Sequence, residues 1–226
     1  MKPRIGSMFL TTLFVCLLSH PNVYSQLVNV PGVYGTGVAS PGVLIAEGSV
    51  DPHYTIISGP VTGTAYVVTS ATMPTSWPWI WNPNGPTSSW ISFSSTSTSS
   101  SVGAYVYRTT FDLTGFLPET AVLTGSWNTD NNGTGILLNG VSFNFTTSPD
   151  SYREGPSPFT ITSGFAPGLN TLDFALFDGD VTTGWAGATG LRVDGLEVKA
   201  VPEPSTYALL IVATGAGALW WARRRR

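Results

Sequence analysis

Apolar and polar residues alternate over short runs along most of the chain, and glycine, proline, serine and asparagine separate these runs. In "TLDFALFD", residues 171–178, the apolar Leu172, Phe174 and Leu176 recur at every second position. This period predicts a strand that turns these three side chains toward the core and Asp173 toward the solvent. Similar runs predict further strands at residues 43–46, 53–57, 64–69, 90–93, 103–111, 121–127, 135–138, 141–145, 158–161 and 191–198.

Two departures from simple alternation predict local geometry. In "GLRVDGLEV" the apolar Leu191 and Val193 share one face, and the phase shifts at Gly195. A phase shift at a glycine is typical of a β-bulge. In "LLNGVSF" the pair Asn139 and Gly140 stands between two apolar runs, which predicts a tight β-hairpin turn.

The spacing of these runs predicts an all-β fold, a two-sheet β-sandwich or jelly roll over residues 42–200. Residues 26–41 are expected to form an extended lead-in or an added edge strand. The polar, low-complexity stretch "SFSSTSTSSSVG", residues 92–103, predicts a mobile loop or a poorly fixed edge.

The start of the chain has the features of an export signal. A basic "MKPRIG" precedes the apolar "MFLTTLFVCLL", which is short for a membrane span, and "NVYSQ" follows. We expect residues 1–25 to be a signal peptide that signal peptidase removes after Ser25, so that Gln26 begins the mature protein. The alternative is an uncleaved N-terminal anchor.

Composition and charge argue against some classes of function and some modes of stabilisation for this chain. Charged residues make up 10% of the chain, against about 25% in an average soluble domain. Residues 26–201 hold four basic and twelve acidic residues, a net charge of −8 that the whole-chain value of −3 conceals. Such an acidic domain is a poor nucleic-acid binder. The only cysteine, Cys16, lies in the predicted signal peptide, so the mature domain depends on its core instead of disulfides.

The last 25 residues fall into three parts: the motif Pro202, Glu203 and Pro204, an uncharged stretch at residues 207–222, and the basic tail Arg223, Arg224, Arg225 and Arg226. As a helix, residues 207–222 would be about 24 Å long, short of the ~30 Å hydrocarbon core. We predict a marginal membrane helix whose arginine end is cytoplasmic. The two prolines are expected to prevent a continuous strand or helix and to leave the motif extended and accessible.

This order of motif, apolar stretch and terminal arginines closely resembles the PEP-CTERM sorting signal. The resemblance implies processing by an exosortase, a membrane-embedded transpeptidase-like enzyme of Gram-negative bacteria that make exopolysaccharide. It also implies cleavage near residues 202–204, after which the domain is released or attached at the cell surface. The alternative is an ordinary C-terminal tail anchor with a proline-rich linker.

The body of the chain resembles the galactose-binding-like jelly-roll domains of exported bacterial proteins. The resemblance covers residues 42–199 and rests on "DPHYTI", "YVYRTTFDLTGF", "AVLTGSWNTDNNGTGILLNG", "GFAPGLNTLDFALFD" and "ATGLRVDGLEV", in that order. It implies a two-sheet sandwich of about eight to ten strands. Such domains often bind sugars at loop ends, sometimes hold a structural calcium, and rarely catalyse reactions.

Four tryptophans lie within "SWPWIWNPNGPTSSW": Trp77, Trp79, Trp81 and Trp90. An extended, proline-rich backbone would project alternate rings to one side, and an exposed aromatic face suits stacking on a sugar. These residues are therefore candidate sugar-stacking residues. The alternative, which we favour for at least two of them, is that the rings plug the end of the sandwich.

Oxygen ligands cluster in "NTDNNG" and "FDGD", which makes Asp130, Asp178 and Asp180 candidate calcium ligands. The competing interpretation is a set of Asx-rich turns without metal. No other cofactor is predicted.

Catalytic chemistry has little support in the sequence. His53 is the only histidine of the predicted mature chain, and a zinc site needs three or four His or Cys ligands. Carboxylate pairs for glycoside hydrolysis can come from distant strands, so spacing does not exclude them.

Together these features predict an exported, exosortase-processed cell-surface or extracellular-matrix protein that crosses the inner membrane of a Gram-negative bacterium. Its predicted role is non-enzymatic, as a structural or adhesive component associated with exopolysaccharide in a biofilm. Two alternatives stay open: a carbohydrate-binding module that uses the loop tryptophans, and a glycoside hydrolase-like enzyme.

Overall fold

The computed structural model describes residues 26–76, 80–179 and 187–203, and these ranges form strands and no α-helix. The strands are β1 (Val28–Asn29), β2 (Val38–Ser40), β3 (Val43–Leu44), β4 (Val50–Ser58), β5 (Gly63–Val67), β6 (Ile91–Ser92), β7 (Gly103–Asp112), β8 (Phe116–Asp130), β9 (Asn132–Leu138), β10 (Val141–Phe143), β11 (Ser157–Ile161), β12 (Leu169–Asp178) and β13 (Gly190–Pro202). The predicted all-β class is confirmed.

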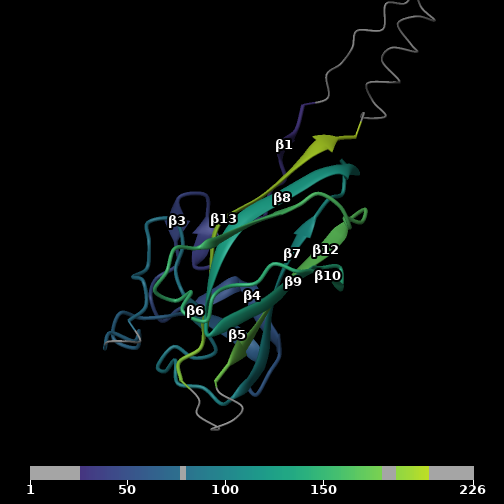
Figure 1. Cartoon of the computed structure of the whole chain (residues 1–226). Coiled ribbons are helices and arrows are strands. Elements are labelled where there is room, and N and C mark those ends of the chain that lie inside the picture. The colour runs from purple at the N-terminus through teal and green to yellow at the C-terminus, as the bar shows by residue number, and fades with distance from the viewer. Residues whose placement is uncertain (1–25, 77–79, 180–186, 204–226) are drawn as a thin grey trace, which may run out of the picture.

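One continuous, strongly curled sheet makes up most of the fold, in the order β10-β9-β12-β7-β4-β5-β6-β13-β8-β11, with β1 added to β13 and a separate β2-β3 pair (Figure 1). The curl brings β8 and β11 over β12: the rings of Trp127 and Phe159 lie 5.7 and 5.9 Å from that of Phe174. We predicted two separate sheets. Instead β5 and β6 join the two layers by strand pairing, because the twist of each strand accumulates into a curl.

The alternation predicted for β12 is observed, since Leu172, Phe174 and Leu176 are fully buried. The prediction that Asp173 faces the solvent is wrong, because its side chain is only 7% exposed. Arg108 stands directly opposite it on β7 and donates two hydrogen bonds to its carboxylate, of 2.6 and 2.7 Å. This bidentate pair supplies the partner that a covered carboxylate requires.

Both local predictions of backbone geometry are confirmed. The register of β13 against β8 shifts between Asp194 and Glu197, and Gly195 in this bulge has a φ of 59°. The β9–β10 hairpin turns at Asn139 and Gly140, which have φ values of 52° and 79°. Positive φ at both central residues is the geometry that an Asn-Gly turn favours.

The lead-in, residues 26–41, packs onto the sheet. β1 pairs with Ala200 and Lys199 of β13, and the Thr36 amide donates to the Val193 carbonyl at 3.0 Å. The buried carboxylate of Asp51 accepts a hydrogen bond from the Gly37 amide at 2.7 Å. The lead-in therefore forms a short edge strand, a loop that β4 and β13 hold in place, and strand β2 of the separate two-stranded pair.

The polar stretch at residues 92–103 is better fixed than expected. The Ser100 amide donates to the Gly187 carbonyl at 3.0 Å, and Ser99 forms an isolated bridge with Ala188. Thr98 is buried and its hydroxyl donates to the Thr72 carbonyl at 3.1 Å. Low complexity indicated mobility, but serine and threonine also supply hydrogen-bonding groups that can fix a loop.

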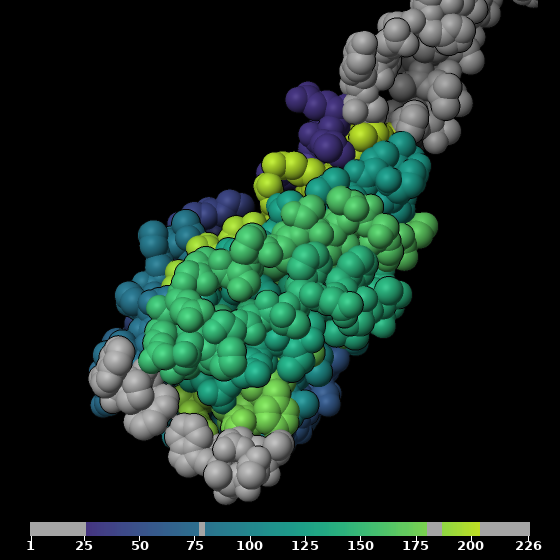
Figure 2. Space-filling view, viewed as in Figure 1, coloured from purple at the N-terminus to yellow at the C-terminus, as the bar shows by residue number. Residues whose placement is uncertain are grey.

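Strand register defines two opposite ends of the molecule. Pro202, at the end of β13, pairs with Phe116, and β1 lies beside the same end of β13; we call this end the terminal pole. Figure 2 shows the purple start of the described chain and the yellow end of β13 together there. At the other end of β13, Gly190 pairs with Asp130, and we call that end the acidic pole. A strand of this length separates the two poles by roughly 40 Å.

Three predicted features lie outside the described residues: the signal peptide with Ser25, the membrane helix at residues 207–222, and the basic tail at residues 223–226. Within the ranges that the structure does describe, no helix is long and apolar enough to cross a membrane.

Candidate functional site

The acidic pole brings together two carboxyl groups from strand ends that are distant in sequence. Asp130 ends β8 and Asp178 ends β12. The Gly179 amide donates to the Asn131 side-chain oxygen at 2.9 Å, which ties the segments after the two strands to each other. Asp130 is 4% exposed and Asp178 is fully buried, so both carboxyl groups have lost most of their hydration.

Within the described part of the chain, each carboxyl group accepts a hydrogen bond from one side chain. The indole Nε1 of Trp81 donates to Oδ2 of Asp130 at 2.6 Å, and the hydroxyl of Ser100 donates to Oδ2 of Asp178. Among the described residues, Oδ1 of Asp178 is buried and accepts no hydrogen bond. Neither carboxyl group takes part in any of the ion pairs that the described residues form. The acidic pole therefore holds buried acidic oxygens with less compensation than burial normally demands.

This environment shifts both pKa values upward. Burial, reinforced by the charges of Asp178 and Asp150 and opposed by the hydrogen bond from Trp81, raises the pKa of Asp130 to about 7. Burial also raises the pKa of Asp178 to about 6, although the hydroxyl of Ser100 and the backbone amide of Gly179 both act to lower it. Two neighbouring carboxyl groups in a poorly hydrated site disfavour simultaneous ionisation, so near neutral pH the pair is suited to hold a proton or a hard cation.

The predicted calcium ligands divide accordingly. Asp130 and Asp178 lie at the same pole and interact electrostatically, whereas Asp180 lies outside the described residues. Within the described ranges, no group of three or more His, Cys, Asp or Glu side chains is placed to hold a metal. The buried Oδ1 of Asp178, which has no hydrogen-bond partner among the described residues, is nevertheless an oxygen of the type that calcium prefers.

The candidate sugar-stacking tryptophans also divide. Trp81 and Trp90 are 2% and 0% exposed, and their rings pack together at 4.5 Å between centroids. The Trp90 indole also donates to the Asn82 carbonyl at 2.8 Å. Burial removes both rings from the sugar-stacking candidates, because neither offers a free face; they match the alternative of rings that plug the sandwich. Trp77 and Trp79 lie outside the described residues.

Sequence reasoning missed two of the residues that shape this pole. Ser100 belongs to a stretch that we expected to be mobile, and Trp81 was considered for its ring face, although its N–H contacts Asp130. Neither partnership has a local signal, because 49 residues separate Trp81 from Asp130 and 78 separate Ser100 from Asp178.

The start of the C-terminal motif belongs to the folded domain. Pro202 is the last residue of β13 and pairs with Phe116, and the Glu203 amide donates to the Gly115 carbonyl at 2.8 Å. β13 thus reaches the first proline of the motif and ends there, because proline has no N–H with which to extend the ladder. The side chains of Pro202 and Glu203 are exposed, as expected, and Pro204 lies outside the described residues.

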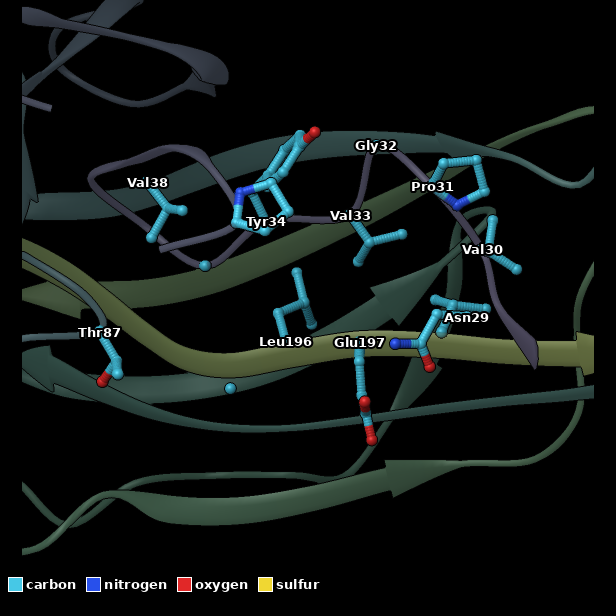
Figure 3. Close-up of a pocket in the computed structure, with 14 residues that line it drawn as sticks. Asn29, Val30, Pro31, Gly32, Val33, Tyr34, Val38, Thr87, Leu196 and Glu197 are labelled. Carbon is cyan, nitrogen blue, oxygen red and sulfur yellow. The ribbon is translucent and has the colours of Figure 1, made fainter. Parts of the chain in front are cut away.

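The catalytic alternative was expected to require two carboxylates in a cleft. An open pocket of about 420 Å³ lies between the lead-in and the bulge of β13, where Val33 and Leu196 point toward each other (Figure 3). Glu197 is the one carboxylate in its lining, and the buried acids of the acidic pole are not part of it. His53 packs its ring against that of Tyr34, at 4.3 Å between centroids, which is consistent with a structural role.

The solved structures that resemble this chain include two carbohydrate-binding modules. The CBM36-1 domain of a multidomain xylanase from the hindgut metagenome of Trinervitermes trinervoides is 12% identical, with a TM-score of 0.28 over 80% of this chain and 98% of that domain. A carbohydrate-binding module CBM36 in complex with calcium and xylotriose is 15% identical, with a TM-score of 0.26 over 76% of this chain and 97% of that module. These scores are too low to carry an argument about function.

No curated protein matches the chain. The C-terminal segment combines three features in order: a Pro-Glu-Pro motif that begins at the last residue of β13, an uncharged stretch, and four arginines. Residues 200–226 match the PEP-CTERM protein-sorting motif.

Proposed function

We propose that this chain is an exported protein that an exosortase processes and delivers to the cell surface or the extracellular matrix of a Gram-negative bacterium. The observation that carries the proposal is the PEP-CTERM sorting motif at residues 200–226. In its mature form the domain serves as a non-enzymatic structural or adhesive component associated with exopolysaccharide. Signal peptidase acts at the other end of the chain, between Ser25 and Gln26.

The geometry of the domain supports this role. Val28 pairs with Ala200, so the described chain begins and ends at the terminal pole, next in sequence to both segments that we predict to enter the membrane. The acidic pole is roughly 40 Å away along β13. A domain tethered through its ends would therefore present the acidic pole away from the membrane, where it can meet extracellular material before and after processing.

Mass spectrometry of the extracellular protein tests the proposal. We expect a mature chain that begins at Gln26 and lacks residues 223–226. A variant with Pro202, Glu203 and Pro204 all replaced by alanine should stay in the membrane fraction with its arginines intact, while alanine at the exposed Val141 should change nothing. An extracellular wild-type protein that still carries all four arginines would refute the proposal.

Association with exopolysaccharide is tested separately by fractionation. The processed protein should sediment with the matrix of wild-type cells and be free in the medium of a strain that makes no exopolysaccharide. Equal solubility in both strains would argue against a matrix role and leave the sorting proposal unaffected.

A second candidate function is sugar binding at the acidic pole with the help of calcium. The observation that favours it is the buried Oδ1 of Asp178, which lacks a donor among the described residues and lies at the same pole as Asp130. The carboxyl groups of Asp130 and Asp178 would hold the calcium ion. Oxygen atoms of sugar hydroxyls could then serve as further ligands of the same ion. Trp77 and Trp79 precede the buried Trp81 closely in sequence and are the remaining stacking candidates.

Thermal unfolding of the purified extracellular protein tests the ion. The melting temperature should rise with calcium chloride relative to EDTA, as expected for a ligand that binds only the folded state, and magnesium should have less effect. Asp178→Asn should abolish this rise, while Asp112→Asn, an exposed carboxylate at the other end of the sheet, should retain it. Identical melting temperatures in calcium and EDTA would exclude the calcium site.

Glycan-array binding tests the sugar. Trp77→Ala and Trp79→Ala should weaken any binding that the wild type shows, while Ile80→Ala, an exposed neighbour in the same run, should not. Unchanged binding in both tryptophan variants would remove the stacking role.

A further inference from the structure

The folded domain and the sorting motif overlap, with no linker between them. β13 pairs on one side with β8, and on the other with β6 and β1. It continues to Pro202, the first residue of the Pro-Glu-Pro motif, and the next amide, that of Glu203, is bonded to the Gly115 carbonyl. The first residue of the motif, Pro202, and the amide of the second, Glu203, are thus already paired with neighbouring backbone.

Thr120 fastens the end of this strand. The register between β13 and β8 shifts between Lys199 and Val201, after which Val201 pairs with Leu117. The Thr120 hydroxyl accepts a hydrogen bond from the Val201 amide at 2.9 Å and donates one to the Leu117 carbonyl at 2.6 Å. The Val201 side chain is 7% exposed, so its withdrawal would also uncover apolar surface.

A protease or transpeptidase binds its substrate as an extended segment and must reach the peptide group that it cleaves, so this group cannot stay paired within a sheet. In this domain the backbone up to the Glu203 amide is already paired, whereas the Glu203 carbonyl has no partner among the described residues. Cleavage before Glu203 would require β13 to peel away from β8. Cleavage after Glu203 leaves every one of these contacts in place.

We infer that the fold sets the processing site: the end of β13, positioned by Thr120 and the Gly115 carbonyl, confines exosortase cleavage to peptide bonds after Glu203. This inference rests on the proposed exosortase processing. The broken bond is the C–N bond of Glu203–Pro204 or of a later peptide. The oxygen of water or the nitrogen of an amine forms a new bond to the carbonyl carbon. The departing segment keeps the peptide nitrogen, which gains a proton. The mature domain therefore retains β13 complete.

The experiment is mass spectrometry of the extracellular C-terminus from cells that contain the exosortase. The full-length wild type is compared with Thr120→Val, which removes the hydroxyl at nearly constant shape, and with Thr120→Ser, which keeps it. A fourth chain carries a Gly-Ser-Gly insert between Val201 and Pro202, which moves the motif off the sheet and leaves β13 paired through Val201.

We expect the wild type and Thr120→Ser to end at Glu203 or beyond. Thr120→Val and the insert variant should yield additional chains that end before Glu203, because the motif backbone is no longer held. Thermal unfolding of each product identifies a variant that fails to fold, and the insert variant keeps the test decisive if Thr120→Val does not fold.

Three results would count against these ideas, and they are distinguishable. A wild-type chain that ends at Pro202 or earlier overturns the inference, although exosortase processing stands. The same C-terminus in all four chains also overturns it, because the motif sequence alone would then fix the site. Intact arginines on the extracellular wild-type protein overturn the proposed function itself.

Discussion

The two poles of this domain handle polar groups in opposite ways. At the terminal pole the amides of Val201 and Glu203 both have acceptors, and the Thr120 hydroxyl is the acceptor for Val201. At the acidic pole two carboxyl groups are buried, their pKa values are raised, and one oxygen has no donor among the described residues. The first arrangement stabilises the end of a strand. The second costs stability, and uncompensated strain of this kind is typical of sites retained for function.

The largest expected effect comes from removing the ring that plugs the acidic pole. Trp81→Ala should lower the free energy of unfolding by about 3–5 kcal/mol, because it empties a buried volume and removes the donor to Asp130. Urea denaturation of the purified extracellular protein measures this loss. Trp81→Phe, which keeps an aromatic ring but removes the N–H and part of the indole volume, should lose less. Equal losses would show that the hydrogen bond, and not the packing, dominates.

The next effect is a dependence of stability on pH that originates at the acidic pole. The folded-state pKa of Asp130, about 7, lies above its ordinary value of 3.8, so its stabilising contribution is complete below about pH 4 and is lost as the pH rises to about 7. The raised pKa of Asp178, about 6, acts in the same direction. The free energy of unfolding should fall by about 1–3 kcal/mol between pH 4.5 and pH 7.5 at constant ionic strength.

Denaturation at a series of pH values checks this slope. Asp130→Asn, which cannot ionise, should flatten the profile and make the protein more stable than the wild type at pH 7.5. A wild-type profile that rises over this range would mean that Asp130 and Asp178 are stabilised as carboxylates, and would contradict our description of the acidic pole.

A smaller effect follows from the donor to Asp178. Ser100→Ala removes the hydrogen bond that opposes the raised pKa of Asp178, so that pKa should rise further. At neutral pH the loss of stability should be about 1–2 kcal/mol, and it should shrink at pH 4.5, where the carboxyl group is protonated. The same denaturation series measures both values. Ser99→Ala, the adjacent change, should have little effect at either pH.

The smallest effect is expected at the terminal pole. Thr120→Val leaves the Val201 amide without its acceptor and should cost about 1 kcal/mol. No titratable group takes part in this contact, so the loss should be the same at pH 4.5 and pH 7.5. If the loss in free energy of unfolding differed between the two pH values, the terminal pole would not be independent of titration, and the contrast between the two poles would be wrong.

The strands could be predicted from the sequence because their signals are local. Side chains alternate across a strand, so the spacing of Leu172, Phe174 and Leu176 identifies the buried face without knowledge of the neighbouring strands. Gly195 and the Asn139-Gly140 pair likewise indicate positive φ by their own chemistry. The same reasoning failed for Asp173, because its burial depends on Arg108 from another strand.

The candidate site could be predicted only in part. Turn chemistry singled out Asp130 and Asp178, but the partners Trp81 and Ser100 come from loops far away in the sequence. An aromatic residue in a proline-rich run suits a sugar and a core equally well. Only packing distinguishes these cases, and it buries Trp81 and Trp90.

The sequence by itself determined the all-β architecture, the turns and the sorting motif, because each is encoded in the order and spacing of neighbouring residues. The tertiary structure decided that the sandwich is one curled sheet, that two acids share a buried pole, and that the sorting motif begins inside the last strand. These properties depend on contacts between segments that only the register of distant strands brings together, and no local pattern encodes that register.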